Sequence, residues 1–140
     1  MGGKAPSVLA EHMTQVEFLE QSGVYEAMWP NFSEWVAWFD RQGLMGTVRG
    51  KNGEISGVAL ARCIPNGVEP DHYVHDENGE NLFVDLCATS GIRNAESIQP
   101  LQGLLLIFLY RLGPRKRIIF KRLGQPKEYD YCKFMRKALS

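Results

Sequence analysis

The sequence predicts one α+β domain, in which an antiparallel hairpin is followed by a parallel strand–helix–strand unit and helices flank the mixed sheet. Three observations predict this class. Two helical patterns precede residue 44, two β-like runs flank an Asn-Gly turn, and residues 82–120 alternate strand, loop, apolar helix and strand. The 140 residues suit a single domain over 1–140, and 44% hydrophobic with 23% charged residues is typical of globular chains.

The N-terminal part predicts two helices. Residues 1–6 are expected to form a loose tail, and Ser7 is placed to cap a first helix that runs to about Gln21. A second helix is expected from Asn31, which makes a capping-box-like pair with Glu34. Both segments carry apolar residues at helical spacing, so each should bury one face.

A hairpin follows the second helix. The runs Leu44–Arg49 and Ile55–Ile64 flank Asn52 and Gly53, and an Asn-Gly pair favours a type I′ turn with positive φ at both residues. A polar connection then extends from residue 65 to residue 81.

The next strand is predicted at Leu82–Cys87, where apolar residues on both faces indicate a central position that Asp85 interrupts. The loop 88–95 leads into a helix capped near Ser97 that ends at Leu112. This helix is apolar on almost every side, so we expect it to be buried between other elements.

A short strand at Arg117–Phe120 should pair in parallel with the central strand after the crossover. Pro126 is expected to open the last helix, which ends near Leu139. Its core side would hold Tyr131, Cys132, Met135 and Leu139.

Charge is uneven along the chain although the net charge is zero. Residues 111–140 hold ten Lys and Arg against two carboxylates, a net charge of +8, so residues 1–110 carry −8. This asymmetry indicates either an anionic partner near the C-terminal third or attraction between the two parts of the chain.

Composition also bears on the compartment. The three cysteines, Cys63, Cys87 and Cys132, are far apart in sequence, which favours reduced thiols. There is no signal-peptide pattern and no apolar run of membrane-spanning length, so a cytoplasmic protein without a membrane span is expected.

The order of these elements resembles the GNAT acyltransferase superfamily. Ile55-Ser56-Gly57-Val58-Ala59 is similar to the family's second hairpin strand, and Leu82–Cys87 to its central strand. Gly91–Ala95 would then be the pyrophosphate loop and Leu101–Leu112 the cofactor helix, with residues 118–139 completing the unit. The family's first strand is not evident, and a sheet edge left bare there would favour a homodimer or a protein partner.

The resemblance implies a donor, an acceptor and site residues. The donor would be acetyl-CoA or another acyl-CoA, and the acceptor an unidentified amine or protein. The cofactor-binding positions would be Cys87, Thr89, Gly91, Ile92, Arg93, Asn94, Ala95 and Arg122. Backbone N–H groups at a helix N-terminus would bind the pyrophosphate.

Three residues are candidates for proton transfer. The resemblance implies Asp85 as the base and Tyr131 as the acid, and His75 is an alternative base. An aspartate between apolar neighbours is desolvated, so its pKa should rise. Each of the three has a structural alternative, which is hydrogen bonding or packing without chemistry.

Two further patterns are weaker. His72 and His75 form a His-x-x-His with flanking carboxylates, but no third ligand is fixed by spacing, so no metal site is predicted. Trp29, Trp35 and Trp38 cluster in sequence, where they fit either core packing or a cleft for an apolar chain.

Three classes of function remain after these observations. The leading one is an acyl-CoA-dependent acyltransferase of the N-acetyltransferase type, acting on an amine. The second is a non-catalytic GNAT-like scaffold or interaction protein, for instance of a phage particle or another complex. The third is a nucleic-acid-binding domain, which the basic C-terminal third suggests.

Overall fold

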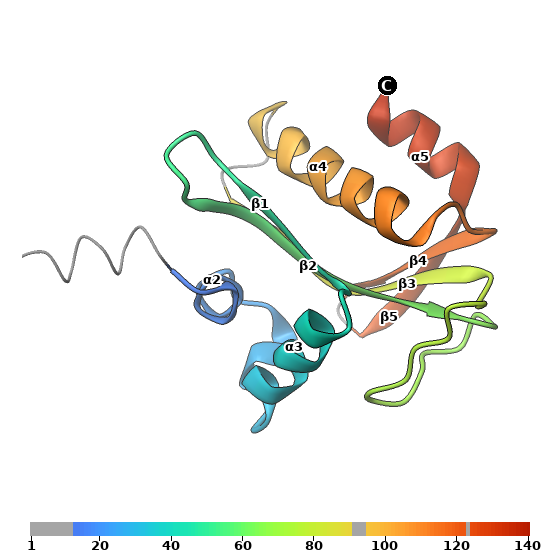
Figure 1. The fold of residues 1–140 in the computed structure, drawn as a ribbon, viewed down its shortest axis with the longest axis horizontal. Coiled ribbons are helices and arrows are strands. Elements are labelled where there is room, and N and C mark those ends of the chain that lie inside the picture. Colours follow the sequence, from blue (N-terminus) through green and yellow to red (C-terminus); the bar gives the residue numbers. More distant parts are fainter. Residues whose placement is uncertain (1–12, 91–94, 123) are drawn as a thin grey trace, which may run out of the picture.

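The protein is an α+β domain built on one open sheet, and the computed structural model describes its residues 13–90, 95–122 and 124–140. Helices α2 (Gln15–Gln21) and α3 (Phe32–Arg41), with the short 3-10 helix η1 (Tyr25–Met28), lie against one face of the sheet (Figure 1). Helices α4 (Ala95–Leu112) and α5 (Tyr131–Leu139) lie against the other. The predicted α+β class is confirmed.

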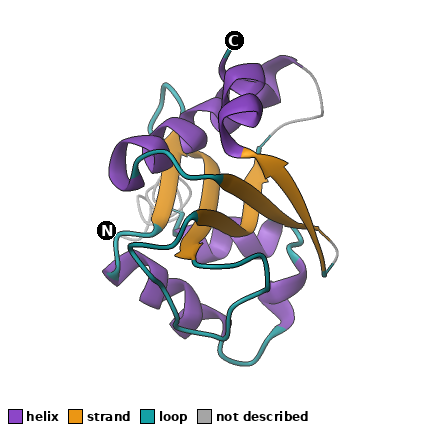
Figure 2. Cartoon of the chain, turned by 90° about the vertical axis from the view of Figure 1, so that its right-hand side faces the viewer, coloured by secondary structure: helices purple, strands orange, loops and turns teal. Residues whose placement is uncertain are grey.

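Five strands follow one another across the sheet in chain order. Figure 2 shows the sheet with helices on both of its faces. They are β1 (Met45–Arg49), β2 (Ile55–Ile64), β3 (Asn81–Thr89), β4 (Arg117–Arg122) and β5 (Gln125–Asp130). All neighbours are antiparallel except β3 and β4, which are parallel. The predicted hairpin, the central strand and the parallel strand–helix–strand unit are therefore all present.

The first helix differs from its prediction. The tail at 1–6 and the start at Ser7 lie outside the described residues, but Thr14 is extended and caps α2 from there. Thr14 and Glu17 form a complete capping box. The helix that ends at Gln21 therefore begins at Gln15, and the predicted continuous helix up to Gln21 is wrong. In α3, Asn31 is the N-cap as predicted, although its side chain makes no capping hydrogen bond.

The hairpin between β1 and β2 forms with a different turn. Gly53 has φ of 84°, but within the described ranges Tyr73 is the one non-glycine residue with positive φ, so the type I′ prediction for Asn52 is wrong. The Gly53 N–H donates to the Gly50 carbonyl, and the Gly50 N–H donates to the Glu54 carbonyl. This is the longer hairpin loop that places glycine in the left-handed position after a turn.

The last helix was also predicted too long. Residues 125–130 form the edge strand β5, antiparallel to β4, and the helix begins only at Tyr131. Pro126 is tolerated because an edge strand has one side without ladder hydrogen bonds. Asp130 then caps α5 by accepting a hydrogen bond from the Lys133 N–H.

The core lies on both faces of the sheet. Leu19, Trp35, Phe39 and Leu60 belong to the cluster under α2 and α3, and Leu82, Leu104, Phe108 and Ile118 to the cluster under α4 and α5. The outer side of α4 is not covered, since Ile98, Leu106 and Tyr110 are 53%, 51% and 93% exposed. The prediction of a helix buried on all sides is therefore wrong. None of the described helices has the length and apolar character needed to cross a bilayer.

Candidate functional site

The two parallel strands separate before they end. β3 pairs with β4 only from Asn81 to Val84, whereas β3 runs on to Thr89. Among the described residues, no strand pairs with the last part of β3 on that side. Two hollows open at this separation, one on each face of the sheet.

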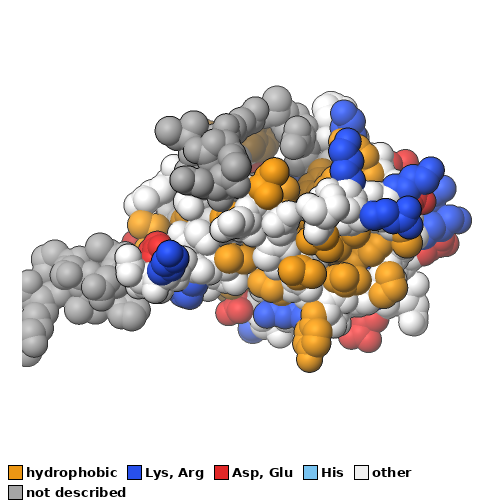
Figure 3. All heavy atoms as spheres, turned by 90° about the horizontal axis from the view of Figure 1, so that it is seen from above, with side chains coloured by type: hydrophobic (Ala, Val, Ile, Leu, Met, Phe, Trp, Pro, Cys, Tyr) orange, Lys and Arg blue, Asp and Glu red, His pale blue; other side chains and the backbone are white. Residues whose placement is uncertain are grey.

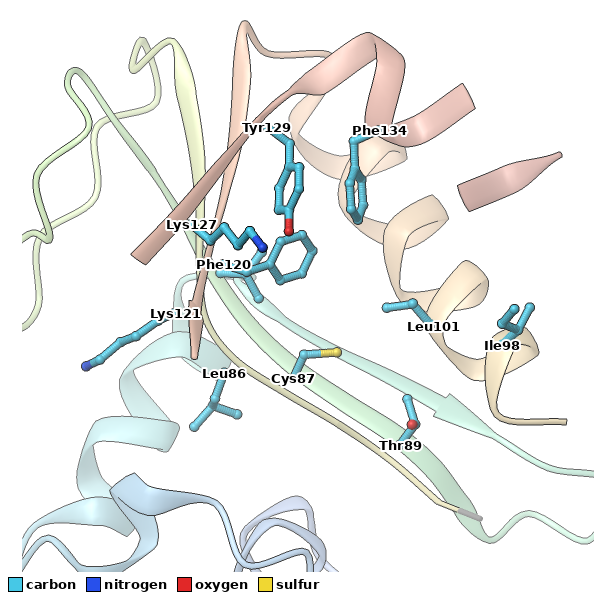
Figure 4. Close-up of a pocket in the computed structure, with 11 residues that line it drawn as sticks. Leu86, Cys87, Thr89, Ile98, Leu101, Phe120, Lys121, Lys127, Tyr129 and Phe134 are labelled. Carbon is cyan, nitrogen blue, oxygen red and sulfur yellow. The ribbon is translucent and has the colours of Figure 1, made fainter. Parts of the chain in front are cut away.

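The first hollow, called the cleft below, lies between β3, the β4–β5 hairpin, α4 and α5 (Figure 4). Its volume is about 350 Å³. Its lining residues are Val84, Leu86, Cys87, Thr89, Ile98, Leu101, Phe120, Lys121, Lys127, Tyr129 and Phe134. One wall is apolar and comes from α4, and the opposite wall is aromatic and cationic.

The aromatic wall is a cluster of three rings. Phe134 lies with its centroid 5.1 Å from Phe120 and 5.3 Å from Tyr129, and the Lys127 ammonium is 5.9 Å from the Tyr129 ring (Figure 4). Lys127 and Tyr129 share a face because side chains on β5 alternate. The strand β5, which the sequence did not predict, thus supplies Lys127 and Tyr129 of this wall.

A β-bulge decides which side chains of β3 face the cleft. Leu60 of β2 pairs with Leu86 and Ala61 with Val84, so Asp85 is an extra residue on β3. The bulge shifts the alternation by one residue. Leu86 belongs to the core under α2 and α3, whereas Cys87 packs against the α4 side and its thiol points toward Leu101 in Figure 4.

The second hollow, called the acidic hollow, lies on the opposite face of the sheet and has a volume of about 220 Å³. Its lining residues are Trp29, Trp35, Arg62, Glu69, Pro70, Asp71, His72, Asp85 and Lys121. A wider aromatic mouth of about 410 Å³ shares Trp29, Trp35 and His72 with it and adds Tyr73.

Asp85 and Arg62 form a buried ion pair at the base of the acidic hollow. Arg62 Nε donates to Asp85 Oδ2 at 2.9 Å and Nη2 to Oδ1 at 2.7 Å, and both side chains are 2% exposed. Burial raises the pKa of Asp85 to about 6, and the hydrogen bonds and charge of Arg62 limit the rise. The predicted direction of the shift is confirmed.

Lys121 lines both hollows. Its ammonium lies 3.1 Å from a Glu69 oxygen, 3.6 Å from a Glu26 oxygen and 5.4 Å from the centre of the Trp29 ring. In Figure 4 the side chain points away from the other cleft residues. Its stem is therefore part of the cleft, and its charged end belongs to the opposite face.

Of the predicted cofactor positions, Cys87 and Thr89 lie in the cleft. Gly91, Ile92, Arg93 and Asn94 lie outside the described residues. Ala95 is the first residue of α4, and Arg122 is the last residue of β4.

Tyr131 and His75 lie away from the separation of the strands. Asp130 pairs with Arg117 at the start of β4, so Tyr131 lies at the opposite end of the sheet, buried in the core, where burial raises its pKa. His75 Nδ1 accepts a hydrogen bond from the Cys63 N–H at 3.1 Å, and burial is the main cause that lowers its pKa. Neither residue lines the cleft or the acidic hollow.

Other residues of the two hollows were not predicted as site residues. Tyr129 lies two residues before Tyr131, and the strand β5 places its side chain in the cleft. Arg62 and His72 come to the acidic hollow through long-range contacts, which no local pattern of the sequence encodes. Among the described residues, no three His, Cys, Asp or Glu side chains gather in a way that could hold a metal ion.

Comparison of the chain with protein-family models, with curated proteins and with solved structures finds no match. The class that the fold and the site define is an α+β domain with a mixed sheet whose central parallel strands separate over a pair of hollows. Any function assigned to it rests on its own residues.

Proposed function

We propose that this protein is an acyl-CoA-dependent acyltransferase that moves an acyl group to an amine acceptor. One observation carries the proposal, which is the separation of β3 and β4 with a hollow on each face. Asp85 lines one of the two hollows, and Lys121 lines both. Such an arrangement allows a donor and an acceptor to approach the same point from opposite faces.

The described side of the cleft fits an acyl-CoA. The edge of β3 beyond Val84, along which no described strand pairs, would present backbone groups to the amide groups of an extended chain. Cys87, Thr89, Ile98 and Leu101 would flank that chain. Lys127 would meet phosphate charge, since an ammonium and a phosphate oxygen make a strong charge-assisted hydrogen bond.

The donor would supply a thioester carbonyl. In the net transfer the amine nitrogen bonds the acyl carbon, the carbon–sulfur bond breaks, and the ammonium form of the acceptor loses two protons, one of which ends on the departing sulfur. Asp85 is placed to accept a proton from the acceptor, because it lines the acidic hollow and its pKa of about 6 suits proton transfer near neutral pH. Tyr129, whose ring lines the cleft, would donate the proton to the sulfur in the role first expected of Tyr131.

The test is a thermal-shift titration with acetyl-CoA, longer acyl-CoAs and free CoA. Binding to the native state should raise the melting temperature with ligand concentration. Lys127→Glu should weaken binding by about fivefold or more, because it opposes phosphate charge. The matched control is Lys116→Glu, a charge reversal at an exposed ion pair with Glu80, which should titrate like the wild type.

A second candidate, a non-catalytic interaction protein, is favoured by the exposed apolar surface on the outer side of α4. Leu106, Ile107, Tyr110 and Arg111 line a shallow depression there, and Figure 3 shows hydrophobic side chains gathered on this face of the molecule. Exposed apolar patches often mark protein contacts. No rise in melting temperature up to about 1 mM of any CoA ligand would reject the acyltransferase and favour this candidate.

A further inference from the structure

The acidic hollow already holds an ammonium group of the protein itself. Lys121 Nζ lies between the carboxylates of Glu69 and Glu26 and over the face of Trp29, and its side chain is 9% exposed. Two carboxylates and an indole ring are the partners that a primary ammonium prefers. The hollow therefore has the chemistry of a cation site.

Among the described residues, the cations around the hollow do not balance the negative charges. Arg62 and Lys121 contribute two positive charges, and Asp85, Glu69, Asp71 and Glu26 contribute four negative charges. Arg62 is matched by Asp85. Two negative charges remain, which favours a further cation over an anion.

The approach to the hollow is aromatic. The centroid of the His72 ring lies 5.3 Å from Trp29 and 5.9 Å from Trp35, in edge-to-face geometry, and these three rings line both the mouth and the hollow. Trp35 is buried, and its indole N–H has no hydrogen-bond partner among the described groups. Apolar walls that lead to carboxylates suit a ligand with a methylene chain that ends in a positive charge.

We infer that the acidic hollow binds the primary ammonium of an unbranched alkyl amine, such as a lysine side chain or an aliphatic polyamine. This inference rests on the proposed function, since it names the class of acceptor for the same reaction. The methylene stem lies along Trp29, Trp35 and His72, and the ammonium reaches Glu69 and Asp71. Asp85 then lies at the inner end, on the side of the separated strands.

Binding can be measured through the protein's own fluorescence, because all three tryptophans lie at this site. Trp29 and Trp35 line the hollow, and Trp38 contacts Tyr73 at the mouth, with 5.7 Å between ring centroids. The probe is Nα-acetyl-lysine amide, titrated without any CoA ligand. The control probe is Nα-acetyl-norleucine amide, which has the same stem length without the ammonium. Spermidine replaces the lysine probe in a parallel titration to distinguish the two sources.

The lysine probe or spermidine should change the fluorescence saturably, and the norleucine probe should not. Glu69→Gln should weaken binding by about threefold to tenfold, because it removes one charged partner at a half-exposed position. Glu80→Gln, in the exposed pair with Lys116, is the matched control and should bind like the wild type. Saturable binding by only one ammonium probe would identify the source.

Two outcomes would overturn the inference. They are no saturable change with either ammonium probe, or equal affinity of the wild type and the Glu69→Gln variant. A thermal shift with acyl-CoA in the same preparation separates this failure from failure of the proposed function. If acyl-CoA binds and the amine probes do not, the acyltransferase proposal stands and the acceptor is of another class.

Discussion

The guanidinium of Arg62 links the bulge of β3 to the loop that forms the acidic hollow. Two of its nitrogens bind Asp85, and Nη1 donates to the carbonyls of Asp71 at 2.7 Å and Val74 at 3.2 Å. Tyr73, which lies between those two carbonyls, has φ of 62°. Loss of one partner of such a buried pair typically costs about 3–5 kcal/mol. Arg62 therefore fixes the position of His72 and Asp71 as well as the charge of Asp85.

The pH dependence of transfer tests the role of Asp85. Because burial raises its pKa to about 6, the carboxylate takes up a proton as the pH falls through about 6, and a proton acceptor must be ionised. The kcat/KM for transfer should fall about tenfold per pH unit below that value. The measurement is a pH–rate profile from about pH 4.5 to about pH 9 with an alkyl amine acceptor. This range extends to both sides of the pKa of Asp85.

Asp85→Asn should remove the break near pH 6 as well as most of the rate. Since this variant leaves Arg62 unpaired, circular dichroism must first establish that it folds. If it does not fold, the wild-type profile alone decides the question. A profile without a break between about pH 5 and 7 would contradict Asp85 as the proton acceptor.

At the scale of elements, the sequence predicted what local patterns encode. The hairpin and the strand–helix–strand unit were predicted from three local features. These are the glycine in the turn between β1 and β2, the apolar residues on both faces of β3, and the glycine after α4. β5 carries no such pattern. Its six residues are all exposed and it holds Pro126, so its conformation comes from pairing with β4 and not from local propensity.

The difference between local patterns and long-range pairing also explains which site residues were predicted. The raised pKa of Asp85 follows from its apolar neighbours in the chain. Its ion pair with Arg62, 23 residues away, follows from the pairing of β2 with β3, and the position of Tyr129 follows from β5. Bulges are features of strand pairing, so no local pattern indicates that the neighbours Asp85 and Leu86 both lie on the side of α2 and α3.

Close packing of α4 on the hairpin sets one wall of the cleft. A Cβ added at Gly57 would lie 3.2 Å from Leu104 Cδ1 and 3.4 Å from Pro100 Cβ. Gly57→Val should therefore lower the free energy of unfolding by about 1–3 kcal/mol, because the added methyl groups force α4 away from β2. Chemical denaturation measures this change.

Gly67→Val is the control for that substitution. At Gly67 an added Cβ would meet the carboxylate of Glu128, the mobile end of a surface side chain, at 3.1 Å. The change in the free energy of unfolding should stay within about 0.5 kcal/mol. Equal effects of the two substitutions would show that α4 is not held at its closest approach to the sheet.

At the scale of the whole molecule, the two hollows belong to opposite faces of one sheet. The cleft lies on the side of α4 and α5, and the acidic hollow is bordered by the end of η1, by α3 and by the loop after β2. Figure 1 shows these two groups of helices on opposite faces of the sheet. Lys121 is the residue that both hollows share. Donor and acceptor binding should therefore be independent except for changes at this residue.

Two substitutions of Lys121 test this separation. Lys121→Met keeps an unbranched stem in the cleft but removes the ammonium, so acyl-CoA binding should be unchanged and the lysine probe should bind about threefold or more tighter to the freed carboxylates. Lys121→Ala removes the stem as well and should also weaken acyl-CoA binding. The measurements are thermal shift for acyl-CoA and tryptophan fluorescence for the amine.

The Met variant should also be less stable than the wild type, because Glu26 is buried and loses its partner. The amine probe should restore part of that stability by binding the native state. A Lys121→Met variant that binds the amine more weakly than the wild type would mean that Lys121 takes part in acceptor binding instead of competing with it.

The extra residue at Asp85 gives β3 two phases of alternation, one before and one after the bulge. Deletion of that single codon would remove the bulge and leave a regular alternation, in which Leu86 and Ala88 still face α2 and α3 and Cys87 still faces α4. The side chains after the deletion would therefore keep their layers, and the acidic hollow would lose only the carboxylate that pairs with Arg62. At this point of the chain, β3 can lose a residue without moving a side chain to the other layer.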